Sequence, residues 1–436
     1  MKIKTHPQLV YSLIFKIISL ILVFLTTSLT FKYLGKSAYG VWVTIYSIIS
    51  WVYFLDFGFS NVIKTKLPTL LQDKKREINV LISTIYIGIA FISLIILLLF
   101  LFLNYFVSFA DFLNIDVAFI NFNSLLFLNL FFSVFILIIG NYKALFAGLV
   151  KTHVVEFSMM IIQLFVFCTI YGLNKFNLFQ DISRILLISC VFGLLNVLIG
   201  IGFTIYFFNK NKDIKVSFKF FDLNVLKINM SLGFKYFIIQ ACMIVIYSTD
   251  YLLITKYFGP KDVANYDIVL KVFQVPMMLA IAALSPYWSI FSKTFVEKKY
   301  FWIKKTLTIY NFTFFFFIAG IAVLTLIIDK IIYLWLNVRF EISRTLLLAI
   351  SIYITMRSFT AMYNYFLNGI NKINLTLWLT VFGAVINIPL CIILINAGMG
   401  VSGIVIGTCI SILPTTVVLP IQAFQIINRK IKENAI

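Results

Sequence analysis

Twelve apolar runs, each close to or above 20 residues, occupy almost the whole chain. A helix needs about 20 consecutive apolar residues to cross the roughly 30 Å hydrocarbon core of a bilayer. The composition agrees, because only 12% of the residues are charged, against about 25% in soluble domains. The runs fall near residues 9–33, 40–63, 79–104, 121–148, 153–173, 183–208, 229–257, 263–291, 303–328, 343–368, 374–396 and 401–427. The sequence therefore predicts an all-α integral membrane protein with twelve transmembrane helices.

The basic residues between the runs indicate the orientation of the chain. An even number of spans places both termini on one side, and the loops and tails of that side hold 22 Lys and Arg, against nine in the opposite loops. Short cytoplasmic loops carry such an excess, so we expect both termini in the cytoplasm. The net charge of +20 then needs no nucleic-acid partner, since no soluble basic surface is predicted.

Two sequence echoes indicate an internal repeat. Residues 32–35 read Lys-Tyr-Leu-Gly at the end of the first run, and residues 256–259 read Lys-Tyr-Phe-Gly at the end of the seventh. The pattern Tyr142, Gly148, Lys151 recurs as Tyr363, Gly369, Lys372. The echoes predict an N-terminal six-helix lobe over 1–208, a cytoplasmic linker over 209–228 and a C-terminal six-helix lobe over 229–436. Equivalent positions in the two lobes are six spans apart, and because six is even, both lobes have the same orientation in the membrane. We expect the transport path to lie between the two lobes.

Five basic residues lie inside the apolar runs and more than four residues from either end: Lys16, Lys143, Lys235, Lys271 and Arg357. A charge at the centre of a membrane helix costs about 2.5–3.5 kcal/mol on insertion scales. Arg357 lies near the middle of its run, on a polar stripe at helical spacing that also includes Tyr353, Thr360, Asn364 and Asn368. A structural Arg bonded to carbonyls or a carboxylate would explain this stripe, but we favour a water-filled cavity for an anionic cargo.

The other bases have local explanations as well. Lys16 and Lys143 are close enough to the cytoplasmic end of their runs to reach the interface by snorkelling. Lys271 follows Asp267 by four residues, so it forms either a neutral pair or a cargo contact. We take Arg357, Lys16, Lys235, Lys271 and Asn364 as the candidate substrate-binding residues.

Acidic residues inside the runs are candidates for ion coupling. We assign this role to Asp56, Glu156 and Asp250, because intramembrane acids can relay protons or bind cations, although they can also balance nearby Lys. No metal site is predicted, since the five cysteines form no CxxC pair and the chain has two histidines. The sequence Gly-Lys-Ser at 35–37 fails as a P-loop, because Thr30 stands where that motif needs Gly. No catalytic motif is present, so we expect a transporter and not an enzyme.

Three segments resemble polysaccharide flippases of the Wzx type, which are related to the MATE exporters. They are residues 31–40, residues 55–61, and residues 248–254 followed by 257–260 with Asn265 and Tyr266. The resemblance implies two six-helix lobes around a cationic cavity and alternating access. It implies a bacterial inner-membrane protein that flips an undecaprenyl-diphosphate-linked glycan for O-antigen or capsule synthesis. A glycan polymerase and a chain-length regulator are the implied protein partners, no cofactor is expected, and a proton or sodium gradient is the implied energy source.

Three other classes compete with this interpretation. A MATE-type ion-coupled exporter of small organic molecules would share the fold, but its cavity should be acidic, whereas here five buried bases face four buried acids. A peptidoglycan-precursor flippase is expected to have fourteen spans. A membrane-embedded glycan polymerase would carry a large outer loop, which this chain lacks.

Overall fold

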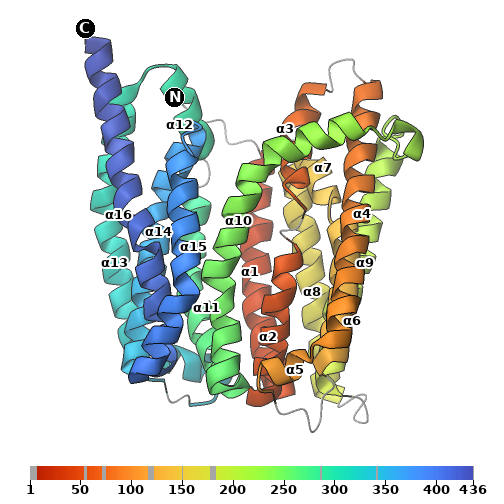
Figure 1. Cartoon of the computed structure of the whole chain (residues 1–436), viewed down its shortest axis with the longest axis vertical. Helices are drawn as coiled ribbons and strands as arrows, with labels where there is room; N and C mark the ends of the chain where they lie inside the picture. Colours follow the sequence, from red (N-terminus) through yellow and green to blue (C-terminus); the bar gives the residue numbers. More distant parts are fainter. Residues whose placement is uncertain are drawn as a thin grey trace. The chain divides into compact units, whose positions relative to one another are not determined.

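The computed structural model describes residues 7–53, 56–70, 75–115, 122–149, 151–176, 183–284, 287–339 and 342–435. Within these ranges the backbone forms helices and connecting turns, and no strand. The chain divides into two compact units, Met1–Phe237 and Ile238–Ile436, and long helices run side by side within each (Figure 1). The predicted lobe boundary at the 209–228 linker stays a prediction.

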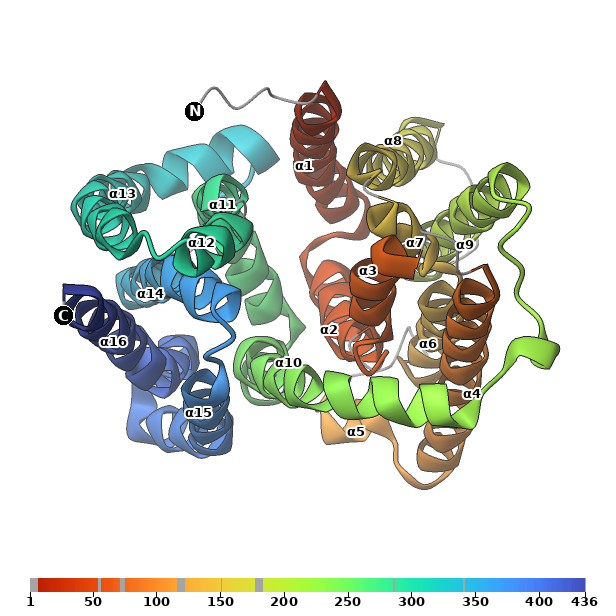
Figure 2. The ribbon, with the colours of Figure 1, turned by 90° about the horizontal axis from the view of Figure 1, so that it is seen from above.

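The N-terminal unit contains α1 to α9 and the first part of α10. The helices are α1 (Pro7–Leu34), α2 (Lys36–Val52), α3 (Phe59–Leu70), α4 (Lys75–Phe106), α5 (Phe109–Phe112), α6 (Phe122–Ile139), α7 (Tyr142–Gly148), α8 (Thr152–Phe176), α9 (Arg184–Lys210), a 3₁₀ turn (Phe218–Phe220) and α10 (Leu223–Phe258). Helix α1 packs along α8, and α6 packs against α4 and α9 (Figure 2).

The C-terminal unit is built around α14. It contains the rest of α10, α11 (Pro260–Leu284), α12 (Tyr287–Val296), α13 (Tyr300–Leu336), α14 (Arg344–Gly369), α15 (Asn374–Leu394), a π-helical turn (Ile395–Met399) and α16 (Gly400–Ala435). Helix α14 packs against α11, α12, α13 and α16, and α16 also packs against α15 (Figure 2). Polar side chains on the faces of α14 that meet these helices, such as Ser351, Ser358 and Thr360, are therefore buried.

Ten helical segments of the described chain are long and apolar enough to cross a membrane. One of them, Asn374–Asn434, contains both α15 and α16, which are separated at Gly398, where φ is 82°. Helix α2 has 17 residues and falls just below the length of a span. Separating α15 from α16 and adding α2 gives the twelve helices expected from hydropathy, and the all-α membrane fold is confirmed.

Some predicted spans are broken where the sequence contains a local turn. The span expected at 40–63 ends at Val52, and α3 starts only at Phe59. Phe57 and Gly58 between them have positive φ, and Asp56 accepts hydrogen bonds from the backbone N–H of Gly58 (2.9 Å) and Ser60 (3.2 Å). An Asp that bonds its own following backbone favours a turn over a continuous helix.

The repeat predicted from the two echoes has the same local geometry in both units. Gly35 and Gly259 each end a long helix with positive φ, 77° and 88°, which Gly adopts without a Cβ clash. In the second echo, the Lys151 N–H donates to the carbonyl of Phe146 and the Lys372 N–H to that of Leu367, both at 2.9 Å. Equal bonds at equivalent positions support two copies of one helical motif.

A Gly in the second echo allows two helices to approach closely in each unit. A Cβ at Gly148 would lie 3.0 Å from the Leu67 side chain of α3, and a Cβ at Gly369 would lie 2.8 Å from the Trp288 carbonyl of α12. A carbonyl fixed in a helix cannot move as a flexible side chain can. The missing Cβ is therefore required for α14 to pack on α12.

We expect Gly369→Ala to lower the stability of the protein by about 1–3 kcal/mol, the usual range for overpacking. Thermal unfolding in detergent, followed by loss of monodisperse protein, measures this change. Gly320→Ala in α13 is the matched control, because a Cβ there meets nothing within 4 Å and the substitution favours helix. Equal stability of the two variants would contradict the close approach at Gly369.

Candidate functional site

The Arg357 guanidinium is held by two tyrosines in the C-terminal unit. Its Cζ lies 4.0 Å from the ring centroid of Tyr247 on α10, and its Nη1 donates to the hydroxyl of Tyr353 at 2.8 Å. An Arg over an aromatic face gains about 2 kcal/mol when the pair is shielded from water. No carboxylate forms a salt bridge with Arg357 in the part of the chain that the structure describes. The guanidinium is thus oriented but not neutralised by a direct ion pair.

The position of Arg357 on its helix explains why such support is needed. It lies 13 residues after Arg344, the first residue of α14, or roughly 20 Å at about 1.5 Å per residue. This is near the middle of the helix, where snorkelling to either interface is difficult. Arg keeps its charge in such surroundings. Tyr353, one turn earlier, supplies the hydroxyl that satisfies one of its donors.

Asp250 on α10 is a buried acid whose two hydrogen bonds come from neutral groups. The Tyr266 hydroxyl of α11 donates to Oδ2 at 3.0 Å, and the Thr408 hydroxyl of α16 donates to Oδ1 at 2.9 Å. Asp250 is 1% exposed. The charge of Arg357 acts on Asp250 through space. A buried carboxyl with two neutral donors can gain or lose a proton without breaking a salt bridge.

Asn387 on α15 organises the polar groups next to Asp250. Its Nδ2 donates to the hydroxyls of Thr408 (3.2 Å) and Ser411 (3.4 Å), and its Oδ1 accepts from Thr249 at 3.4 Å. Asn387 and Thr408 are both fully buried. Three helices, α10, α15 and α16, are therefore joined by one hydrogen-bonded network that ends on the carboxylate.

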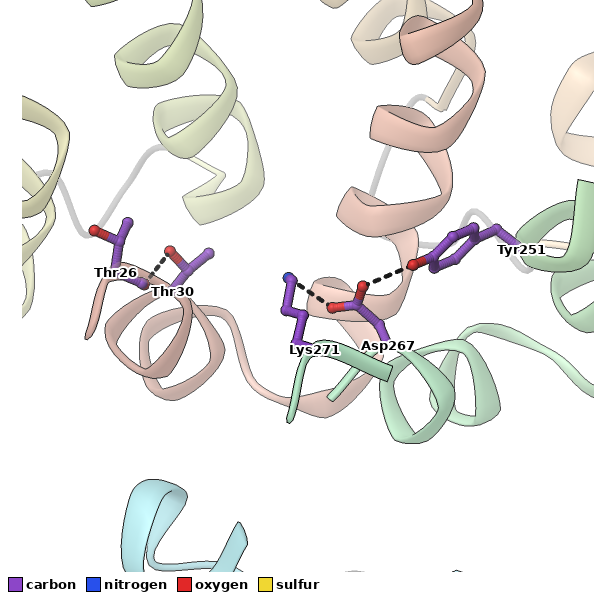
Figure 3. A network of polar contacts seen from close by, with 5 residues as sticks. All are labelled: Thr26, Thr30, Tyr251, Asp267 and Lys271. Carbon is purple, nitrogen blue, oxygen red and sulfur yellow. Dashed lines mark hydrogen bonds and ion pairs between the residues drawn. The ribbon is translucent and has the colours of Figure 1, made fainter. Parts of the chain in front are cut away.

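Lys271 is engaged by Asp267, one helical turn before it on α11. Lys271 Nζ lies 2.7 Å from Asp267 Oδ2, and the Tyr251 hydroxyl donates to Oδ1 at 3.1 Å (Figure 3). The paired interpretation of Lys271 is thus the geometry observed, and its role as a cargo contact stays a prediction. In the N-terminal unit, Figure 3 also shows Thr30 donating to the Thr26 carbonyl at 2.8 Å.

Asn364 lines a small cavity inside the C-terminal unit. The cavity has a volume of about 30 Å³, and Thr360, Thr376, Ser411 and Thr415 also line it. A water molecule needs roughly 10–15 Å³, whereas ligand pockets have about 300–1,000 Å³. This cavity is too small for a sugar ring, and the substrate-binding role of Asn364 stays a prediction.

The remaining candidates lie in the N-terminal unit. Lys16 on α1 is exposed, and Lys235 lies in α10 with its side chain outside the described part. Asp56 bonds the turn before α3, and Glu156 on α8 interacts electrostatically with Lys143 of α7. None of these acids makes a contact that reveals ion coupling, so their coupling roles stay predictions.

Sequence reasoning did not name Tyr247, Asn387 or Thr408, and it named Tyr266 only as part of the family resemblance. None of these four was expected in the site. A signal for Thr408 was present, because Thr408, Ser411 and Thr415 are spaced three and four residues apart in an apolar helix and so share one face. The partners of these residues come from other helices, at separations of up to 158 residues. Hydropathy does not contain that information.

Comparisons with known proteins agree with this architecture. The MatE family model matches residues 236–393. An inward-facing multidrug resistance MATE family transporter of the MOP superfamily has a TM-score of 0.75 and 14% identity, over 95% of this chain and 96% of that one. The chain is similar to MATE-related membrane transporters. The expectations of a multi-pass membrane protein and of a transporter rather than an enzyme are confirmed.

Curated relatives of this protein carry provisional names in O-antigen transport. A Salmonella typhimurium protein named as an O-antigen transporter is 22% identical over 40% of this chain and 41% of its own length. A Yersinia pseudotuberculosis protein named as an O-antigen export protein is 24% identical over 85% of both chains. The resemblance to the Wzx type drawn from the sequence is confirmed.

Proposed function

We propose that this transporter is a flippase for a lipid-diphosphate-linked oligosaccharide repeat unit. It moves this cargo by alternating access from the inner to the outer leaflet of the bacterial cytoplasmic membrane, for O-antigen or capsule synthesis. The relatives named for O-antigen transport and export support this substrate class. In this proposal both termini lie in the cytoplasm, and an undecaprenyl diphosphate carries the glycan.

The proposal rests chiefly on the surroundings of the Arg357 guanidinium. Its guanidinium is fixed by Tyr247 and Tyr353 but forms no salt bridge within the described chain. An Arg presents a planar fork of donors that suits a phosphate. Lys271, by contrast, is engaged by Asp267 at 2.7 Å. Arg357 is therefore the base that we assign to the diphosphate, with Lys16, Lys235, Lys271 and Asn364 as further proposed contacts.

The same observation disfavours an exporter of organic cations. A cationic cargo beside an unpaired guanidinium would experience like-charge repulsion, which is strong where water is excluded. For energy we propose a proton or sodium gradient acting through a buried acid. Asp250 is the favoured residue over Asp56 and Glu156, because Asp250 is deeply buried and lies within the field of Arg357.

The function is tested by transport in vesicles. Purified protein is reconstituted with a fluorescent oligosaccharide linked to polyprenyl diphosphate, and protection of the label from a membrane-impermeant quencher is followed over time. We expect the protein to accelerate translocation at least about 10-fold over protein-free vesicles, since the cargo's charge cannot cross hydrocarbon unaided. Translocation at the protein-free rate, together with export of a small organic cation, would replace this proposal by the multidrug exporter.

A further inference from the structure

The hydroxyl of Thr408 has three polar atoms within hydrogen-bond distance. Its Oγ1 lies 2.9 Å from Asp250 Oδ1, 3.2 Å from the carbonyl oxygen of Ile404, and 3.2 Å from Asn387 Nδ2. A hydroxyl has one hydrogen to donate and two lone pairs to accept. Asn387 Nδ2 is always a donor, so it fixes one lone pair of Thr408. The hydrogen of Thr408 can then point to Asp250 or to Ile404.

We propose that Thr408 is a hydroxyl switch that satisfies both protonation states of Asp250 without moving a helix. This inference rests on the proposed role of Asp250 in ion coupling. It assigns to Thr408 the role of a positioning residue, which acts on the coupled proton through the carboxyl group of Asp250.

In the ionised state, Asp250 Oδ1 is an acceptor and Thr408 donates its hydrogen to it. When a proton from water binds to Oδ1, the new O–H donates to the second lone pair of Thr408. The Thr408 hydrogen then rotates to the carbonyl of Ile404. The proton ends on Asp250, and no covalent bond of Thr408 breaks. The Ile404 carbonyl, which also accepts from the Cys391 thiol at 3.3 Å, is the acceptor of the Thr408 hydrogen in the protonated state.

Tyr266 cannot take the same role. Its hydroxyl donates to Asp250 Oδ2 at 3.0 Å, and within the described residues this hydroxyl makes no second hydrogen bond. If Asp250 Oδ2 carried the proton, one of the two facing O–H groups would lack an acceptor. A buried unpaired donor costs about 1–3 kcal/mol. The geometry therefore directs the proton to Oδ1, the oxygen that faces Thr408.

Other groups around Asp250 set the field in which this switch works. The charged or titratable side chains that interact with it electrostatically are Tyr251 on its own helix, Tyr266 on α11, Tyr353 and Arg357 on α14, Cys391 on α15 and Cys409 on α16. Arg357 is the permanent charge among them. It stays the same in the variants of Thr408, so their comparison isolates the hydroxyl.

The test compares Thr408→Val with Thr408→Ser. Val has nearly the shape of Thr without the hydroxyl, whereas Ser keeps the hydroxyl. Infrared difference spectra of the purified protein, recorded over a pH series, follow the protonated carboxyl band of Asp250, and Asp250→Asn identifies that band. This measurement needs no cargo and no transport.

We expect Thr408→Val to move the titration midpoint by about one pH unit toward higher pH. The ionised carboxylate loses a charge-assisted bond, which is stronger than the neutral bond that the protonated form loses. Thr408→Ser should stay within about 0.3 units of the parent. If Thr408→Val does not fold, Thr408→Cys supplies a weaker donor and should show a smaller shift in the same direction.

Unchanged midpoints in Thr408→Val and Thr408→Cys would overturn the switch. Failure of the coupling role itself has a different signature, namely that Asp250→Asn exports glycan with the same dependence on the gradient as the parent. The two measurements therefore separate an error about Thr408 from an error about Asp250.

Discussion

Replacing Arg357 by Ala is expected to reduce glycan export about 100-fold while the protein remains in the membrane. The loss corresponds to one or two charge-assisted bonds to a diphosphate, each about 1.5–3 kcal/mol. Cells that lack the endogenous flippase, complemented with each variant, report export as surface glycan. Immunoblotting of membranes reports the amount of protein.

Two further variants make this result specific. Arg357→Lys keeps the charge but loses the planar fork, so partial export is expected. Arg344→Ala removes an exposed Arg at the start of the same helix and should leave export unchanged. Full export by Arg357→Ala at equal protein level would exclude Arg357 as a cargo contact.

Asp250→Asn is expected to uncouple export from the ion gradient. Asn has nearly the same shape and cannot ionise, and its amide can donate to Thr408 while Thr408 donates to the Ile404 carbonyl at 3.2 Å. The fold should therefore be retained. We expect a protonophore or a sodium ionophore to reduce export by the parent about 10-fold or more and to leave the residual export of the variant unchanged. The measurement is the initial rate of translocation in vesicles with and without an imposed gradient.

The matched control is Asp329→Asn on α13, where the carboxylate is exposed. This variant should keep the response of the parent to the gradient. A variant at Asp250 that still follows the gradient would transfer the coupling role to another acid. Asp56 and Glu156 would be the next candidates, although Asp56 is engaged by the turn before α3.

The ion pair between Asp267 and Lys271 is a part of the candidate site that could be predicted from the sequence alone. Asp267 and Lys271 are four residues apart, and an acid placed one turn before a base meets it on the same helix face. The structure has this pair at 2.7 Å. The contact was open to prediction because helical periodicity alone brings the two side chains together. The same holds for Arg357 and Tyr353, also four residues apart on one polar stripe.

Contacts between helices could not be predicted in this way. Tyr247 covers Arg357 from α10, and Thr408 reaches Asp250 from α16. Both contacts depend on the rotation and depth at which distant helices pack, which Gly residues and side-chain shape determine. For Asn364 the sequence was misleading about size. The polar stripe that includes Asn364 suggested a substrate cavity, but the surrounding helices leave a cavity of about 30 Å³.

The sequence by itself determined the number of membrane helices, the internal repeat and the set of buried charges. Hydropathy suffices for this, because a bilayer forces every spanning segment to satisfy its backbone internally, so an apolar run of this length becomes a helix. Only the tertiary structure decided which buried charges are neutralised. Pairing depends on distances of a few ångströms between helices, and these show Lys271 paired, Asp250 hydrogen-bonded to neutral hydroxyls and Arg357 oriented by two tyrosines.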